Sequence, residues 1–396
     1  MPNPTDRLSP NYFATLTARV NELRAAGHDV IRLDIGSPDL PPAPHIVDAL
    51  TRSARDSASH GYQPHSGSLE IRQAWAQLYQ NRHGVYLNPD DVLPLLGSKE
   101  GVFHLSLAIL NPGDVVLVPD PGYQTYAQGA RFARAEPVSV PLLAENNFLP
   151  DLESIPAEIA RRAKLMWLNY PNNPTAAVAN FEFFARSVEF ARRNEILLVH
   201  DAAYTQVTFD GWHAPSVMEV PGAADVAVEL NTLSKSHNMA GWRLGVAAGN
   251  KDAIGALRKL KTHADSGHFL PVQEGAVAAL TGDQSWLLAR NAVYQTRRDA
   301  AMSALRGMGL QPHISKASLY IWCPIPDPWR SMDFVLHILN TAHVSLTPGS
   351  IFGPGGEGYF RLSLVLPVEV IAAAMERVQN VERLQRANVQ TCQLER

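Results

Sequence analysis

The chain has 396 residues, of which 46% are hydrophobic and 18% are charged, as in ordinary globular proteins. This length exceeds the usual size of one hydrophobic core, so we expect two or three domains. The 34 Lys and Arg residues against 38 Asp and Glu residues give a net charge of −4, which excludes the basic excess of a nucleic-acid-binding protein. Two cysteines, Cys323 and Cys392, are too few for a disulfide framework or a four-cysteine zinc site.

The start of the chain lacks the features of a targeting segment. Residues 1–7 contain no apolar run, so we expect no secretory signal. The most apolar stretch, near residues 100–118, is interrupted by polar residues and does not reach the ~18 apolar residues of a membrane span. We therefore expect a cytoplasmic protein in a reducing compartment, with neither a membrane nor a nucleic acid as its partner.

Short apolar runs alternate with helical patterns in the middle of the chain. The predicted strands cover residues 91–96, 114–118, 164–168, 196–199 and 226–230, and the predicted helices cover 102–110 and 181–193. This alternation indicates βαβ units and a mainly parallel sheet. The run 196–199 shows no polar alternation, which is typical of a strand that helices cover on both faces.

The pattern changes after about residue 271. Here the sequence predicts a long helix over 284–307, a strand over 318–322, a helix over 333–340, a strand over 359–364 and a final helix from 368. We expect the first residues, with a helix over 8–26, to pack on this second domain. The predicted organisation is an N-terminal arm (1–44), a large α/β domain (45–285) and a small α+β domain (286–396).

Polar residues follow four of the predicted strands. They are the segments Gly97–Gly101, which opens a helix, Asn169–Pro174, His200–Tyr204 and Asn231–Lys235. In open α/β sheets, ligands bind outside the carboxyl ends of the strands. The four segments therefore bring a phosphate cradle, an amide, a carboxylate with a phenol, and a lysine to one predicted site.

Lys235 ends the segment that follows the strand predicted over 226–230. A lone lysine in a loop is usually solvated, but hydroxyls at Thr232, Ser234 and Ser236 surround this one, and Arg243 follows nearby. A lysine can form a Schiff base where nearby positive charge lowers its pKa. Hydroxyls and an arginine suit a phosphate dianion. Together they indicate a carbonyl cofactor that carries a phosphate.

Asp201 has two interpretations. It could cap the N-terminus of a helix. It could also hold a pyridine nitrogen protonated, which is the electron sink that carbanion chemistry on pyridoxal phosphate requires. Tyr204 and Asn173 could then hydrogen-bond the ring hydroxyl, and Tyr123 could stack on the ring, although each alone would more often serve packing or a turn.

Arg361 lies among apolar and aromatic residues in a predicted strand of the second domain. A buried arginine needs a partner, which leaves two alternatives. One is an ion pair between the domains. The other is a bidentate clamp on a substrate carboxylate, which the geometry of a guanidinium suits.

In order along the chain, Asn173-Pro174-Thr175, Asp201-x-x-Tyr204, Ser234-Lys235, Arg243 and Arg361 resemble the class I/II aminotransferases of pyridoxal-phosphate fold type I. The resemblance extends over residues 34–361. It implies a large domain with a mainly parallel, seven-stranded-type sheet between helices, and a smaller α+β domain from both termini. It also implies ping-pong transfer of an amino group between an L-amino acid and a 2-oxo acid.

The resemblance implies a role for each matched residue. Lys235, Asp201 and Tyr204 would be catalytic, with Lys235 as the Schiff-base lysine, Asp201 on the pyridine nitrogen, and Tyr204 with Asn173 on the ring oxygen. The remaining residues that would bind pyridoxal 5′-phosphate are Tyr123 on the ring and Ser98, Lys99, Thr232, Ser234 and Arg243 around the phosphate.

The remaining matched residues concern the substrate and a second subunit. Arg361, Asn173 and the backbone of Gly36 would bind the substrate carboxylate. Tyr62 matches the tyrosine that reaches the phosphate in the partner subunit, so the resemblance implies a homodimer with shared active sites.

Several segments, among them Leu33–Asp39 and Pro141–Asn146, are most similar to LL-diaminopimelate aminotransferases. Two features depart from that group. Ala176 stands where a glycine is usual, and the segment Ser236–Ala240 is similar to alanine or broad-range aminotransferases. The substrate therefore stays open between LL-diaminopimelate with 2-oxoglutarate and a broad-range alanine/aspartate type. A β-lyase on the same cofactor would share every residue named. No metal site is predicted, because the five-residue separation of His263 and His268 does not match the paired histidines of zinc proteases.

Overall fold

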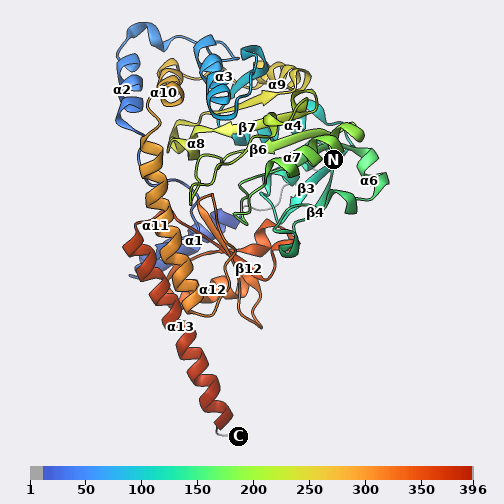
Figure 1. Cartoon of the computed structure of the whole chain (residues 1–396). Coiled ribbons are helices and arrows are strands. Elements are labelled where there is room, and N and C mark those ends of the chain that lie inside the picture. Colours follow the sequence, from blue (N-terminus) through green and yellow to red (C-terminus); the bar gives the residue numbers. More distant parts are fainter. Residues whose placement is uncertain (1–11, 395–396) are drawn as a thin grey trace, which may run out of the picture.

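The computed structural model describes residues 12–394 and arranges them as a large sheet with helices on both faces and a smaller α+β layer (Figure 1). The seven strands found there for the large sheet lie in the spatial order β2 (Val92–Leu95), β8 (Gly245–Gly249), β7 (Ala227–Thr232), β6 (Leu197–Asp201), β5 (Ala163–Leu168), β3 (Val115–Asp120) and β4 (Glu136–Pro141). β8 runs antiparallel to both of its neighbours, and the other pairs are parallel. The predicted fold class is confirmed.

Both faces of the large sheet are buried. In β5, Leu165 and Trp167 join one apolar cluster, whereas Met166 and Leu168 join another on the opposite face. The first cluster includes residues of α4 (Ser98–Ile109), α5 (Thr125–Phe132) and α9 (Lys251–Ala264). The second includes residues of α2 (Pro44–Ala54), α3 (Leu69–His83), α6 (Ala157–Arg162), α7 (Phe181–Arg193) and α10 (Leu270–Thr281). This two-sided cover explains the unbroken apolar runs in the sequence.

The smaller layer combines elements from both ends of the chain. Its antiparallel sheet has the order β11 (Thr347–Pro348), β12 (Tyr359–Ser363) and β9 (Tyr320–Pro324). Its helices are α11 (Trp286–Gly307), α12 (Ser331–Ala342) and α13 (Val368–Leu394). From the N-terminal side, α1 (Tyr12–Ala25) packs on Leu339, and β1 (Ile31–Arg32) pairs in parallel with β10 (Val344–Ser345).

Several element boundaries differ from the predicted ones. The helix predicted over 102–110 begins earlier, at Ser98, and the strand predicted over 196–199 continues to Asp201. The predicted start of the first helix at residue 8 lies outside the described residues. The domain boundaries at 44/45 and 285/286 stay predictions. Over residues 12–394, no helix combines the length and apolar character needed to cross a membrane.

Candidate active site

A cavity of about 460 Å³ lies at the carboxyl ends of the central strands, where an open α/β sheet binds ligands. The predicted site residues that line it are Gly36, Ser98, Lys99, Tyr123, Asn173, Asp201, Tyr204, Thr232, Ser234, Lys235, Arg243 and Arg361. Tyr62 does not line this cavity. Its side chain is 96% exposed, in the loop before α3. The structure therefore brings together every predicted site residue except Tyr62.

Lys235 lies in α8 (Leu233–Ser236), a single helical turn directly after β7. The Thr232 hydroxyl accepts a hydrogen bond from the Ser234 backbone and so caps this turn. The Lys235 Nζ atom donates to the Gly36 carbonyl oxygen at 2.5 Å. Burial lowers the pKa of Lys235, and the Arg243 charge acts in the same direction. A lysine held in this way is readily deprotonated to a nucleophilic amine.

Asp201 is the last residue of β6, and one of its carboxylate oxygens has no partner among the residues that the structure describes. Its Oδ2 atom accepts a hydrogen bond from the Tyr126 hydroxyl at 2.8 Å. Its Oδ1 atom is buried and has no hydrogen-bond partner among the described residues. Burial raises the pKa of Asp201 to about 6, although Tyr126 opposes the shift. A buried acceptor without a partner costs free energy, so Oδ1 fits a donor from a ligand.

One end of the cavity is suited to bind an anion. Helix α4 begins at Ser98 and presents its first backbone N–H groups there. Arg243 donates to the Ser234 hydroxyl at 3.4 Å and to the Leu96 carbonyl at 3.3 Å. Gly97 has a φ of +83°, and a Cβ at this position would lie 2.3 Å from the Arg243 guanidinium. Only glycine therefore allows this close approach of arginine and helix.

Arg361 is a buried cation that has no anionic partner among the described residues. Its side chain extends from β12, and the residue is 3% exposed. It donates to the Asn173 side-chain oxygen at 2.7 Å, but no carboxylate of the described residues lies within 4 Å of it. Among the described residues, no ion pair between the domains is therefore found for Arg361. A buried guanidinium without an anion fits a carboxylate ligand.

Comparison of the whole chain with known proteins identifies its family. The family described as "Aminotransferase class I and II" matches residues 28–378. The chain belongs to the class I and II aminotransferases. The predicted resemblance is thereby confirmed for most of this aminotransferase, and the match includes every predicted site residue.

Two relatives and one solved structure illustrate the similarity. The LL-diaminopimelate aminotransferases of Moorella thermoacetica and Desulforudis audaxviator are 46% and 48% identical over 375 and 373 residues, which is 94% of this chain and 96% and 95% of theirs. The substrate-bound BacF structure from Bacillus subtilis has a TM-score of 0.93 and 37% identity, with coverage of 96% of this chain and 98% of that chain. This aminotransferase therefore shares its fold with proteins that match it over nearly their whole length.

The cavity of this aminotransferase is also lined by residues to which the sequence analysis assigned no individual role. They are Phe13, Arg32, Asp34, Ile35, Ser37, Tyr126, Asn169, Ala203, Ala240, Tyr320 and Phe352. Tyr126 lies one helical turn after Tyr123, and this spacing is the only local signal that could have revealed it. Tyr320 begins a strand of apolar residues and is indistinguishable in the sequence from a core phenol.

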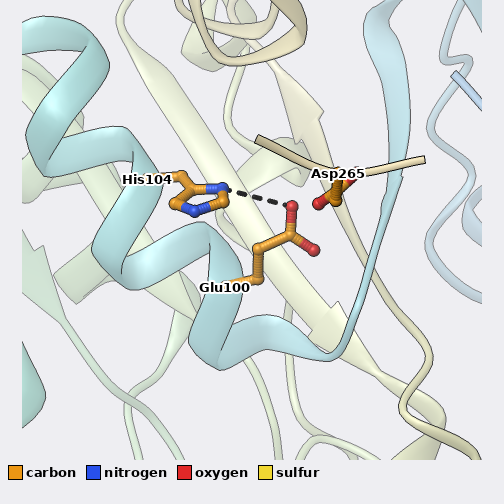
Figure 2. A group of neighbouring side chains, drawn as sticks. All are labelled: Glu100, His104 and Asp265. Carbon is orange, nitrogen blue, oxygen red and sulfur yellow. Dashed lines mark ion pairs between the residues drawn. The ribbon is translucent and has the colours of Figure 1, made fainter. Parts of the chain in front are cut away.

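Behind the anion-binding end, a second cluster braces α4. Figure 2 shows Glu100, His104 and Asp265 side by side, a grouping that could hold a metal ion. The Lys261 ammonium, which is fully buried, lies 3.0 Å from Glu100 and 2.7 Å from Asp265, so an internal cation balances these carboxylates. Glu100 also accepts from the Leu96 backbone N–H, and so ties the loop before α4 to α9. Burial acts to raise the pKa of Glu100, but His104 and Lys261 together lower it to about 2.

Lys261→Met is expected to lower the free energy of unfolding by about 3–5 kcal/mol at neutral pH, because two carboxylates would lose their buried counter-charge. The loss should shrink as the pH falls, since protonation removes the uncompensated charge. Urea unfolding of the variant measures both effects. Lys259→Met, at an exposed position of the same helix, is the matched control. Equal losses in the two variants would contradict the bracing role of Lys261.

Proposed function

We propose that this aminotransferase binds pyridoxal 5′-phosphate in the cavity and moves an amino group from LL-diaminopimelate to a 2-oxo acid, such as 2-oxoglutarate, by a ping-pong mechanism. One observation carries the proposal. Three groups line one cavity, whose size suits a cofactor together with a substrate. They are the Lys235 amine, the Asp201 oxygen that has no partner among the described residues, and the buried Arg361 guanidinium.

The residues present fit the cofactor. The Asp201 Oδ1 atom, which has no partner among the described residues, suits the protonated nitrogen of the pyridine ring. The first turn of α4, Arg243 and Ser234 suit the phosphate. Lys235 suits the aldehyde. When bound, the cofactor supplies an electron sink for the negative charge that develops at the substrate Cα.

Each side chain then has a chemical task. With the cofactor bound, the Lys235 amine would serve as the base that accepts the proton from the substrate Cα and as the acid that gives the proton back. Asp201 holds the proton on the ring nitrogen, and the Tyr204 hydroxyl donates to the ring oxygen. Arg361 binds the substrate carboxylate and, through its 2.7 Å hydrogen bond, orients Asn173 beside it.

The substrate assignment is supported by the names of relatives that are 46% and 48% identical to this chain over 94% of its length. LL-Diaminopimelate carries a second carboxylate and a second amine at its far end. The Lys99 ammonium, which lies 6.0 Å from the centre of the Tyr123 ring in the cavity wall, is our candidate partner for that carboxylate.

A single-donor assay tests the proposal. With 2-oxoglutarate as acceptor, kcat/KM for LL-diaminopimelate should exceed those for alanine and aspartate by about 10²-fold. Activity with alanine or aspartate and none with LL-diaminopimelate would replace the substrate assignment by the broad-range alternative. Without an acceptor, an aminotransferase stops after one turnover, whereas a β-lyase continues and would contradict the proposed reaction.

We also propose a homodimer in which Tyr62 completes the phosphate site of the partner subunit. The Tyr62 side chain is almost fully exposed, which is unusual for a large aromatic residue. Nearby, His60 contacts the ring of Phe269, which is itself 45% exposed. This aromatic surface suits a second copy of the chain. The cytoplasmic location stays a prediction.

A further inference from the structure

Tyr320 joins two parts of the site that come from different layers of the molecule. It is the first residue of β9, in the small sheet, and it is 3% exposed. In the register of β9 with β12, Tyr320 lies opposite Ser363, and Trp322 lies opposite Arg361. Side chains two residues apart share one face of a strand, so Tyr320 and Arg361 are diagonal neighbours on the same face.

The Tyr320 ring supports the Arg361 guanidinium. The central guanidinium carbon lies 4.1 Å from the centre of the Tyr320 ring, which is a cation–π contact. Phe352 lies near the same carbon, at 4.9 Å. The Arg361 Nη2 atom donates to the Asp34 carbonyl oxygen at 3.1 Å. No carboxylate among the described residues holds this arginine, so the aromatic face acts together with its hydrogen bonds to Asn173, Asp34 and Thr347 to orient it.

The Tyr320 hydroxyl holds a second group of the site. It lies 3.0 Å from the Tyr204 hydroxyl, within hydrogen-bond distance, and both phenols are buried. Tyr204 follows β6 of the large sheet, so this hydrogen bond crosses from one layer to the other. When Tyr204 donates its proton to the ring oxygen of a cofactor, its own oxygen is free to accept from Tyr320.

Gly36 leaves room for this phenol. A Cβ on Gly36 would lie 2.1 Å from the Tyr320 hydroxyl oxygen, and the Gly36 φ is not in the left-handed region, so space requires the glycine here. The carbonyl of the same residue accepts from Lys235. The Tyr320 hydroxyl thus lies beside the backbone that holds the predicted catalytic lysine.

We propose that Tyr320 is a positioning residue that couples the two halves of the site, with its hydroxyl fixing Tyr204 for the cofactor ring oxygen and its ring fixing Arg361 for the substrate carboxylate. This inference rests on the proposed binding of pyridoxal phosphate. It assigns separate tasks to the hydroxyl and the ring of one side chain, and two substitutions separate them.

Tyr320→Phe removes only the hydroxyl. A donor to the ring oxygen of the cofactor stabilises the deprotonated form of the loaded protein, and a loosened Tyr204 is a weaker donor. The pH midpoint of the visible absorbance change should therefore rise by about 0.5. The KM values of both substrates should stay within about twofold of the wild-type values, because the aromatic face for Arg361 remains.

Tyr320→Leu removes the ring as well. The KM values of the amino donor and the 2-oxo acid should then rise by about tenfold in addition to the absorbance shift, because Arg361 loses its aromatic support. Tyr359→Phe is the matched control, since this tyrosine lies on β12 of the same small sheet but does not line the cavity, and it should change neither quantity.

A double-mutant cycle tests the coupling directly. In a Tyr204→Phe background, Tyr320→Phe should cause no further shift of the absorbance midpoint. A shift that persists there, or an unchanged midpoint in the single variant, would overturn the proposal. If Tyr320→Phe does not fold, Gly36→Ala displaces the same hydroxyl and should cause the same upward shift. A wild-type protein that binds no pyridoxal phosphate would instead refute the proposed function.

Discussion

Lys235→Ala is expected to lower turnover by at least ~10⁴-fold, because the variant loses both the nucleophile and the base of the proposed reaction. The anion-binding end of the cavity is unchanged, so the variant should still bind pyridoxal phosphate. The covalent bond between the chain and the cofactor should be absent from the variant. Borohydride reduction followed by mass spectrometry should show the cofactor covalently bound to the wild-type chain and not to the variant.

Two controls isolate the role of the Lys235 amine. Lys235→Arg keeps the positive charge but cannot transfer protons at neutral pH, so it should be as inactive as the alanine variant. Lys251→Ala, at an exposed position at the start of α9, should behave like the wild type. Retention of turnover and of covalent attachment in Lys235→Ala would refute the role assigned to this lysine.

Asp201→Asn is expected to slow the half-reaction with the amino donor by about 10²–10³-fold while cofactor affinity falls much less. The amide has nearly the same shape as the carboxylate but lacks the negative charge that holds a proton on the ring nitrogen. Stopped-flow absorbance measures the half-reaction, and equilibrium titration with pyridoxal phosphate measures the affinity.

The structure also supplies a control for the Asp201 prediction. Asp48→Asn makes the same chemical change at an exposed position on α2 and should alter neither quantity. If the Asp201 variant reacted within tenfold of the wild-type rate, the carboxylate would not serve the electron sink. A loss of affinity as large as the loss of rate would point to a purely structural role.

The predicted part of the site consists of residues that follow apolar runs. Asp201 ends β6, and Asn173 and Lys235 lie within five residues of the ends of β5 and β7. The carboxyl ends of these three strands lie side by side. The sequence pattern alone is sufficient to predict these residues, because the residues that follow parallel strands lie along one edge of the sheet.

Each of the missed residues discussed here has at least one partner far away along the chain. The hydroxyl of Tyr126 contacts a residue 75 positions away, and that of Tyr320 contacts one 116 positions away. Neither phenol differs locally from a core side chain. Lys261 lies in a polar helical segment that resembles a solvated face, yet it is fully buried because two carboxylates converge on it. Contacts with residues distant in the sequence decide these cases, although Tyr126 also lies one helical turn after Tyr123 and Lys261 lies four residues before Asp265.

Strand β8 is an element of the fold that the local sequence does not predict. Its residues, Gly245–Gly249, are glycine, valine and alanine, a composition with little intrinsic preference for a strand. The segment forms a strand because β7 and β2 pair with it on either side. Pairing within the sheet therefore determines that these five residues form a strand, and their own sequence does not.

The pairing of β1 with β10 has a consequence for the order of assembly during translation. Ile31 is synthesised before every strand of the large sheet, but its partner Val344 is synthesised after all of them. All strands of the large sheet lie between residues 31 and 344 of the chain. The large sheet can therefore form before the residues around Leu339, on which the first helix packs, have been synthesised. A nascent chain arrested shortly before residue 339 should therefore expose the apolar side of its first helix to chaperones.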